Sequence, residues 1–222
     1  AAHEARRVAD PAEDEVIVRL ESSGGMVHAY GLAAAQLARI KEAGLNLTVC
    51  IDKVAASGGY MMACVADKIL AAPFAVVGSI GVVAQVPNFH DLLEKHDIDV
   101  EVFTAGKYKR TVTVFGENTE EDKQKFQQEL EETHKLFKDF VRKYRPSLDV
   151  EQVATGEHWY GEDAITRNLV DALQTSDSYI LEKMTDSELY AIQSRQKPTI
   201  AQKLGISQAA QAVVATAIDK LP

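Results

Sequence analysis

Apolar and polar positions form short blocks along the chain that predict strands and helices in turn. The apolar block 16–20 predicts a buried strand, and the glycine-containing residues 21–25 end it. Apolar residues then recur at helical spacing through 26–40. Further blocks continue the pattern, with strands expected at 45–51, 68–71 and 76–84 and a helix at 57–66. Strands that alternate with helices predict an α/β fold with a mostly parallel sheet and flanking helices.

The second half of the chain is more helical. A short helix is expected around 89–93 and a strand at 99–104. A long amphipathic helix is predicted at 119–145, because acidic residues follow Thr119 at its start and Pro146 stops it. Another helical piece covers 161–169, and an apolar stripe recurs through 199–221.

Three regions follow from these blocks. Residues 1–14 are polar and are expected to be a linker, residues 15–175 the main domain, and residues 176–222 a C-terminal helical extension. The apolar stripe of this extension can dock on the body or on a neighbouring copy, which leaves two alternatives: oligomer contacts, or folding back over the active site.

Composition narrows the function classes. The formal net charge of −9 argues against a nucleic-acid partner, because phosphate binding needs a basic face. Cys50 and Cys64 lie in apolar runs without metal-ligand spacing, and glycine-rich phosphate motifs are absent, so neither metal nor cofactor is expected. The sequence also lacks an apolar run of the length of a membrane helix.

Ser57 is the candidate nucleophile. It stands among small residues in Val54-Ala55-Ala56-Ser57-Gly58-Gly59-Tyr60, directly before a predicted helix. Backbone N–H groups at such a turn can stabilise an oxyanion, and a second donor can come from the Gly24-Gly25 turn. An oxyanion hole usually needs two donors, which here would be one N–H from Ser57 and one from the Gly24-Gly25 turn; the alternative is a plain tight turn at Gly24-Gly25.

A lysine is the candidate general base. Lys109 follows a predicted strand in Gly106-Lys107-Tyr108-Lys109, and it can act as a base only if a desolvated pocket keeps its amine neutral. Lys107 competes for the role. Ser79, within Gly78-Ser79-Ile80, is placed to hydrogen-bond such an amine or simply to cap a turn. A Ser-His-Asp triad is the obvious rival, but each histidine fits a surface or structural role better, and no G-x-S-x-G motif occurs.

Together these motifs resemble the bacterial signal peptide peptidase A family, and most closely its SohB branch. The resemblance is carried by residues 54–60, 77–82 and 106–109 in this order and spacing, and strengthened by 64–68, 116–121 and 154–161. It covers roughly residues 15–175. One departure is Ser23, which stands where the family usually has proline before the Gly-Gly turn, so that turn is less rigid.

The resemblance implies a ClpP/crotonase-like fold and a serine–lysine dyad. Ser57 would attack the peptide carbonyl, Lys109 would take its proton, and Ser79 would orient the lysine. The N–H groups of Ser57 and of the Gly24-Gly25 turn, with Gly25 the first choice, would bind the oxyanion, and no cofactor would take part. It also implies a homo-oligomer on the periplasmic side of the bacterial inner membrane, held by an anchor missing from this chain, with apolar peptides such as released signal peptides as substrates. Two alternatives remain: a crotonase-like acyl-CoA enzyme and a catalytically idle, ring-forming scaffold.

Overall fold

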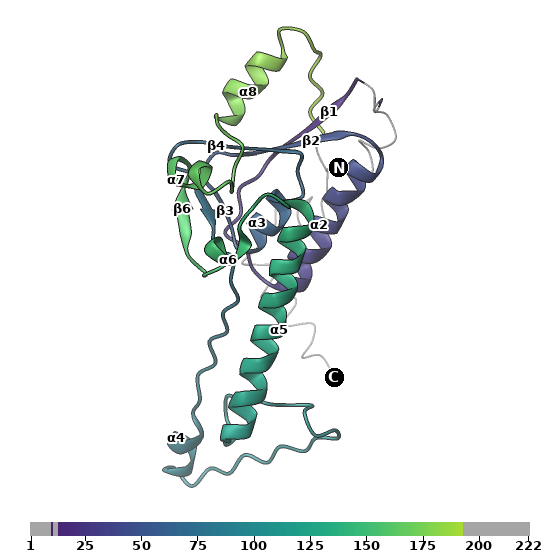
Figure 1. Cartoon of the computed structure of the whole chain (residues 1–222). Coiled ribbons are helices and arrows are strands. Elements are labelled where there is room, and N and C mark those ends of the chain that lie inside the picture. The colour runs from purple at the N-terminus through teal and green to yellow at the C-terminus, as the bar shows by residue number, and fades with distance from the viewer. Residues whose placement is uncertain (1–9, 11–12, 193–222) are drawn as a thin grey trace, which may run out of the picture. The chain divides into compact units, whose positions relative to one another are not determined.

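The computed structural model describes residue 10 and residues 13–192, and all of its helices and strands lie between Glu15 and Lys183 (Figure 1). Its strands are β1 (Glu15–Arg19), β2 (Asn46–Ile51), β3 (Val54–Ala56), β4 (Lys68–Ala71), β5 (Val76–Gly78), β6 (His158–Tyr160) and β7 (Ala172–Leu173). Its helices are α2 (Val27–Glu42), α3 (Gly58–Ala63), α4 (His90–Glu94), α5 (Glu120–Tyr144), α6 (Val150–Val153), α7 (Gly161–Thr166) and α8 (Ser176–Lys183).

The strands form two sheets. The larger has the order β1-β2-β4-β7 with every pair parallel, so that Val18 stands opposite Val49 and Val49 opposite Ile69. The smaller has the order β3-β5-β6, in which β3 and β5 are parallel and β6 is antiparallel to β5. The predicted α/β class with a mostly parallel sheet is confirmed.

Helices cover both faces of the larger sheet. The main core joins this sheet to α2, α3, α5 and α7, and its members include Leu47, Val49, Ile69, Phe137 and Val141. On the opposite face Cys50 and Leu70 pack against Tyr179 of α8. Successive residues of a strand point to opposite faces. The apolar run of β2 is therefore buried on both sides, as a parallel sheet requires.

The long helix α5 begins and ends where its sequence predicts. The Thr119 hydroxyl accepts a hydrogen bond from the Asp122 N–H, and the Asp122 carboxylate accepts one from the Thr119 N–H, which completes a capping box. The last helical residue is Tyr144, directly before Arg145 and Pro146. A proline restricts the residue before it to non-helical conformations, so the helix cannot continue.

Several expected elements differ. Residues 99–104 form no strand, because no neighbouring strand pairs with them and their side chains are exposed, Phe103 at 87%. The strand expected at 76–84 ends at Gly78, where the backbone turns to positive φ. The second helix covers only Gly58–Ala63, and the helix expected at 161–169 ends at Thr166. The apolar stripe at 199–221 lies outside the described residues.

Candidate active site

Ser57 occupies a strained turn between β3 and α3. Its backbone has φ 53° and ψ −120°, a combination that non-glycine residues rarely adopt. Such strain, of about 1–3 kcal/mol, is often concentrated at catalytic sites. The side chain of Ser57 is half-buried, and its neighbours Ala56 and Gly58 are buried. The turn therefore holds the hydroxyl between a buried strand and a buried helix while leaving it accessible.

The loop 22–25 lies directly against this turn. Ser22 extends the smaller sheet, because its N–H donates to the Val54 carbonyl and its carbonyl accepts from the Ala56 N–H. Gly24 is so close that a Cβ added to it would lie 2.8 Å from Ser57 Cβ and 2.9 Å from Gly58 N. The structure thus brings the predicted Gly24-Gly25 turn and Ser57 together, and only a residue without a side chain fits at position 24.

The N–H of Ser57 is already hydrogen-bonded. It donates to the Gly78 carbonyl at 2.8 Å, as a continuation of the pairing between β3 and β5. The predicted role of this N–H in an oxyanion hole therefore does not fit the observed geometry. Within the described chain no hydrogen bond uses the N–H of Gly58 or of Gly25. Gly58, which the sequence interpretation overlooked, is the better partner for Gly25.

Ser79 lies beside Ser57. In the parallel pairing of β3 with β5, Ala56 stands opposite Gly78, so the two serines follow at equivalent ends of neighbouring strands. Both have positive φ, 53° for Ser57 and 51° for Ser79, and both are half-buried. The Ser79 N–H donates to the Glu157 carbonyl at 2.6 Å. The segment 154–161, which in the sequence only strengthened the family resemblance, therefore contacts Ser79 and helps to fix its backbone.

Lys109 lies elsewhere in this conformation. It belongs to the connection 79–119, which leaves the sheets after β5 and returns at the N-terminus of α5 (Figure 1). In Figure 1 the helix of this connection, α4, lies near that end of α5 and away from β3 and α3. Lys109 is exposed, and none of the hydrogen bonds of the described residues joins it to Ser57 or Ser79. The structure brings together the serines and the glycines but not the lysine.

Lys107 differs from Lys109 in its surroundings. Its amine lies 2.9 Å from Glu121 Oε1 and 4.8 Å from the centroid of the Tyr108 ring. Contact with Tyr108 and the ion pair with Glu121 raise the pKa of Lys107 above its ordinary value. An amine held in its charged form cannot accept a proton, so this geometry disfavours Lys107 as the base.

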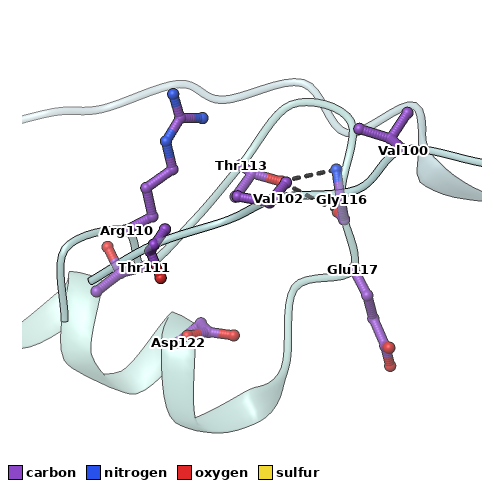
Figure 2. Close-up of a pocket in the computed structure, with 9 residues that line it drawn as sticks. Val100, Val102, Arg110, Thr111, Thr113, Gly116, Glu117 and Asp122 are labelled. Atoms are coloured by element: carbon purple, nitrogen blue, oxygen red, sulfur yellow. Dashed lines mark hydrogen bonds between the residues drawn. The ribbon is translucent and has the colours of Figure 1, made fainter. Parts of the chain in front are cut away.

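The connection has some internal order of its own. The Asn88 amide donates to the carbonyls of Thr113 and Gly116, and the rings of Phe89 and Phe115 stack at 6.2 Å. An open cavity of about 240 Å³ lies between residues 100 and 122. Figure 2 shows its polar side chains, with Arg110 on one side and Glu117 on the other, and the Thr113 hydroxyl bonded to Gly116. Because Ser57 is not part of it, this cavity is not the candidate active site.

One group of side chains has the composition of a metal site. His90, Asp91 and Glu94 of α4 offer ligand atoms within 4.8 Å of one another. Both carboxylates are exposed, and the His90–Glu94 contact of 3.8 Å joins residues one helical turn apart. An ordinary surface pair on a helix explains this arrangement.

Comparison with known protein families decides the assignment. The family model described as peptidase family S49 matches residues 39–190, and the model of its N-terminal part matches residues 6–37. The chain belongs to peptidase family S49. This membership agrees with the expected resemblance and with the ClpP/crotonase-like α/β fold.

Several similar proteins are named as proteases. The chain is 65% identical over 193 residues to a probable protease SohB of Haemophilus influenzae, covering 87% of this chain and 55% of that protein. It is 59% identical over 180 residues to a probable protease SohB of Buchnera aphidicola, covering 81% of this chain and 54% of that protein. The chain thus spans about half the length of these relatives. Among the described residues, no helix is both long enough and apolar enough to cross a membrane.

Proposed function

We propose that this chain is the catalytic part of a serine endopeptidase, with Ser57 as nucleophile and Lys109 as general base. The observation that carries the proposal is the strained Ser57 turn, which lies against Gly24 and beside two unoccupied backbone donors. Membership of peptidase family S49 supports the same reaction class. An acyl-CoA enzyme would use the two donors without needing a nucleophile in a strained turn.

The proposed reaction has two steps, acylation of Ser57 and hydrolysis of the acyl-enzyme. The Ser57 Oγ attacks the peptide carbonyl carbon while its proton passes to the neutral Lys109 Nζ, and the N–H groups of Gly25 and Gly58 stabilise the oxyanion. The C–N bond then breaks, and the leaving amine takes the proton from Lys109. Water attacks the resulting ester and gives a proton to Lys109, which returns it to Ser57 Oγ as the acid product leaves. Ser79, at the neighbouring strand end, orients the lysine amine.

The dyad requires the connection 79–119 to close over Ser57. In the exposed position Lys109 is solvated, and only burial disfavours the charged amine enough to make it a base. The connection carries apolar side chains that face water in the single chain, such as Val83 at 91% and Phe103 at 87% exposure. Burial of these side chains against the body or against a second copy would provide the driving force for closure. We therefore include a homo-oligomer in the proposal.

Labelling and turnover test the dyad. A serine-directed phosphonate is expected to label Ser57, with labelling and peptide cleavage both lost in Ser57→Ala and Lys109→Ala. Lys107→Ala is the matched control, because it changes the same loop and should retain both. Full turnover by Ser57→Ala would overturn the proposal. Tight CoA binding without labelling would favour the acyl-CoA enzyme, and an inert wild-type chain would favour the scaffold.

Mixing the two inactive variants then locates the lysine. If Lys109 serves a neighbouring copy, Ser57→Ala and Lys109→Ala chains should restore part of the activity when they assemble together. If it serves its own chain, the mixture stays inactive. Either result is compatible with the dyad and decides how the connection closes.

Substrate and location belong to the same proposal. The resemblance favours extended apolar peptides, such as released signal peptides, and a site on the periplasmic side of the bacterial inner membrane. An apolar peptide can add as a strand beside the segment that follows β5. Cleavage of an apolar peptide library compared with a charged one tests the preference, and fractionation of cells tests the location.

A further inference from the structure

Tyr30, in the first turn of α2, touches both sides of the candidate active site. A Cβ added to Gly58 would lie 2.3 Å from Tyr30 Cγ, and one added to Gly25 would lie 2.9 Å from Tyr30 Cε2. The Tyr30 ring therefore packs directly against the backbone of Gly25 and Gly58. These are the two residues whose N–H groups are unoccupied beside Ser57.

The hydroxyl of Tyr30 is also engaged. It lies 2.8 Å from Ser22 Oγ, and the Gly24 N–H donates to the same Ser22 Oγ at 3.3 Å. The backbone of Ser22 is paired with β3 on both sides, through Val54 and Ala56. One chain of contacts thus runs from the strand that carries Ser57, through Ser22 and Tyr30, to the Gly24-Gly25 turn.

Apart from these contacts, the turn is restrained by the packing of Gly24 against Ser57 and Gly58. Gly24 and Gly25 both have backbone conformations that glycine adopts freely, with φ 98° and 157°, and no regular element includes residues 20–26. An oxyanion donor is effective only if its position is fixed before the reaction. Glycine restricts its own backbone little, so contacts with the surrounding chain must fix a diglycine turn for it to meet that condition.

We propose that Tyr30 and Ser22 form a positioning pair that fixes the Gly25 N–H relative to the Gly58 N–H. The ring of Tyr30 sets the spacing of the two glycines, and its hydroxyl, through Ser22, sets the orientation of the turn. The inference rests on the proposed function, because it assigns a role in forming the oxyanion hole. Neither residue touches the reacting atoms, so both act through the backbone that they hold.

Kinetics of purified variants test the pair. Tyr30→Leu is expected to lower kcat about 10- to 100-fold with KM changed less than about two-fold, because misplaced donors lose transition-state binding while substrate still binds. Tyr30→Phe keeps the ring and should lose only about three- to ten-fold in kcat, as should Ser22→Ala. The double variant should match Ser22→Ala, since that change already removes the contact with the Tyr30 hydroxyl along with the bond from the Gly24 N–H.

A peptide aldehyde supplies a readout that a purely structural role would not move. Its hemiacetal with Ser57 carries the developing oxyanion, so its inhibition constant should rise by the same factor as kcat/KM falls. The control is Leu37→Ala on the same helix. Leu37 packs against the core, and its loss should lower stability while leaving kcat and the inhibition constant within about two-fold.

The outcomes separate the two proposals. Wild-type protein without Ser57-dependent cleavage would overturn the proposed function and this inference with it. Ser57-dependent cleavage that survives unchanged in folded Tyr30→Phe and Ser22→Ala would overturn the positioning pair alone. If Tyr30→Leu fails to fold, these two variants and their double decide the matter.

Discussion

Gly24→Ala is the substitution for which the structure makes the sharpest prediction. The backbone at Gly24 has φ 98°, where a side chain is strained whatever space surrounds it. An added Cβ would also lie 2.8 Å from Ser57 Cβ, 2.9 Å from Gly58 N and 3.0 Å from Ala56 O. Two of these three are backbone atoms of the strand–helix turn, so relief of the contacts must move the turn that holds Ser57.

The backbone strain and the close contacts of the added Cβ should both lower the stability and the activity of Gly24→Ala. Backbone strain and overpacking each cost about 1–3 kcal/mol, so we expect a loss of about 3 kcal/mol in the free energy of unfolding. For a chain of this size that corresponds to a fall in Tm of about 6–12 °C. Displacement of the nucleophile by up to about 1 Å should slow phosphonate labelling of Ser57 by about 10- to 100-fold.

Gly31→Ala is the matched control. Gly31 lies within α2, and no atom lies within 4 Å of a Cβ added there. Alanine in a helix is more favourable than glycine, so this variant should gain up to about 1 kcal/mol and label at the wild-type rate. Urea unfolding and labelling kinetics measure both quantities. A Gly24→Ala protein within about 0.5 kcal/mol of wild type that labels normally would show the reasoning to be wrong.

Three further predictions concern stability and reactivity. Arg145 is buried and makes a bidentate pair with Asp171 at 2.6 and 2.9 Å, so Arg145→Ala should lower the free energy of unfolding in urea by about 2–3 kcal/mol, less than for a fully buried pair because Asp171 is partly exposed. Arg142 is exposed, so Arg142→Ala should cost under about 1 kcal/mol, and equal costs for the two variants would contradict this prediction. Partial burial favours protonation of Asp52, but hydrogen bonds from Ser176 outweigh it and hold the pKa of Asp52 below its usual range. The contribution of Asp52 to the free energy of unfolding is therefore complete above about pH 4 and is lost as the pH falls through the lowered pKa of the folded state. Asp52→Asn should flatten that part of the curve of stability against pH, as measured by urea unfolding. Burial raises the pKa of Cys64 to about 12 and of Cys50 to about 11, so iodoacetamide at pH 8 should modify neither thiol until the protein is unfolded, and rapid native modification would be inconsistent with the packing.

The order of strands and helices was predictable because it depends on local patterns. The apolar runs of β2 and β4, the helical spacing of α2 and the capping sequence at Thr119 each indicate their element without reference to the rest of the chain. The strand expected at 99–104 failed because β-prone residues form a strand only when another strand pairs with them. Whether such a partner exists depends on the fold, which a local window of sequence does not contain.

From the sequence, the resemblance to the signal peptide peptidase A family predicted that Ser57, Ser79, Lys109 and the Gly24-Gly25 turn form one site, whereas their local surroundings fitted ordinary turns and a surface lysine equally well. Only the tertiary structure decided which backbone groups are free. The Ser57 N–H donates to the carbonyl of Gly78, a residue far along the chain, and this leaves the Gly58 N–H as an available donor beside Ser57. The tertiary structure also places Tyr30 and Ser22 beside the glycines. Contacts between distant segments arise from packing, and the periodicity of the sequence does not predict them.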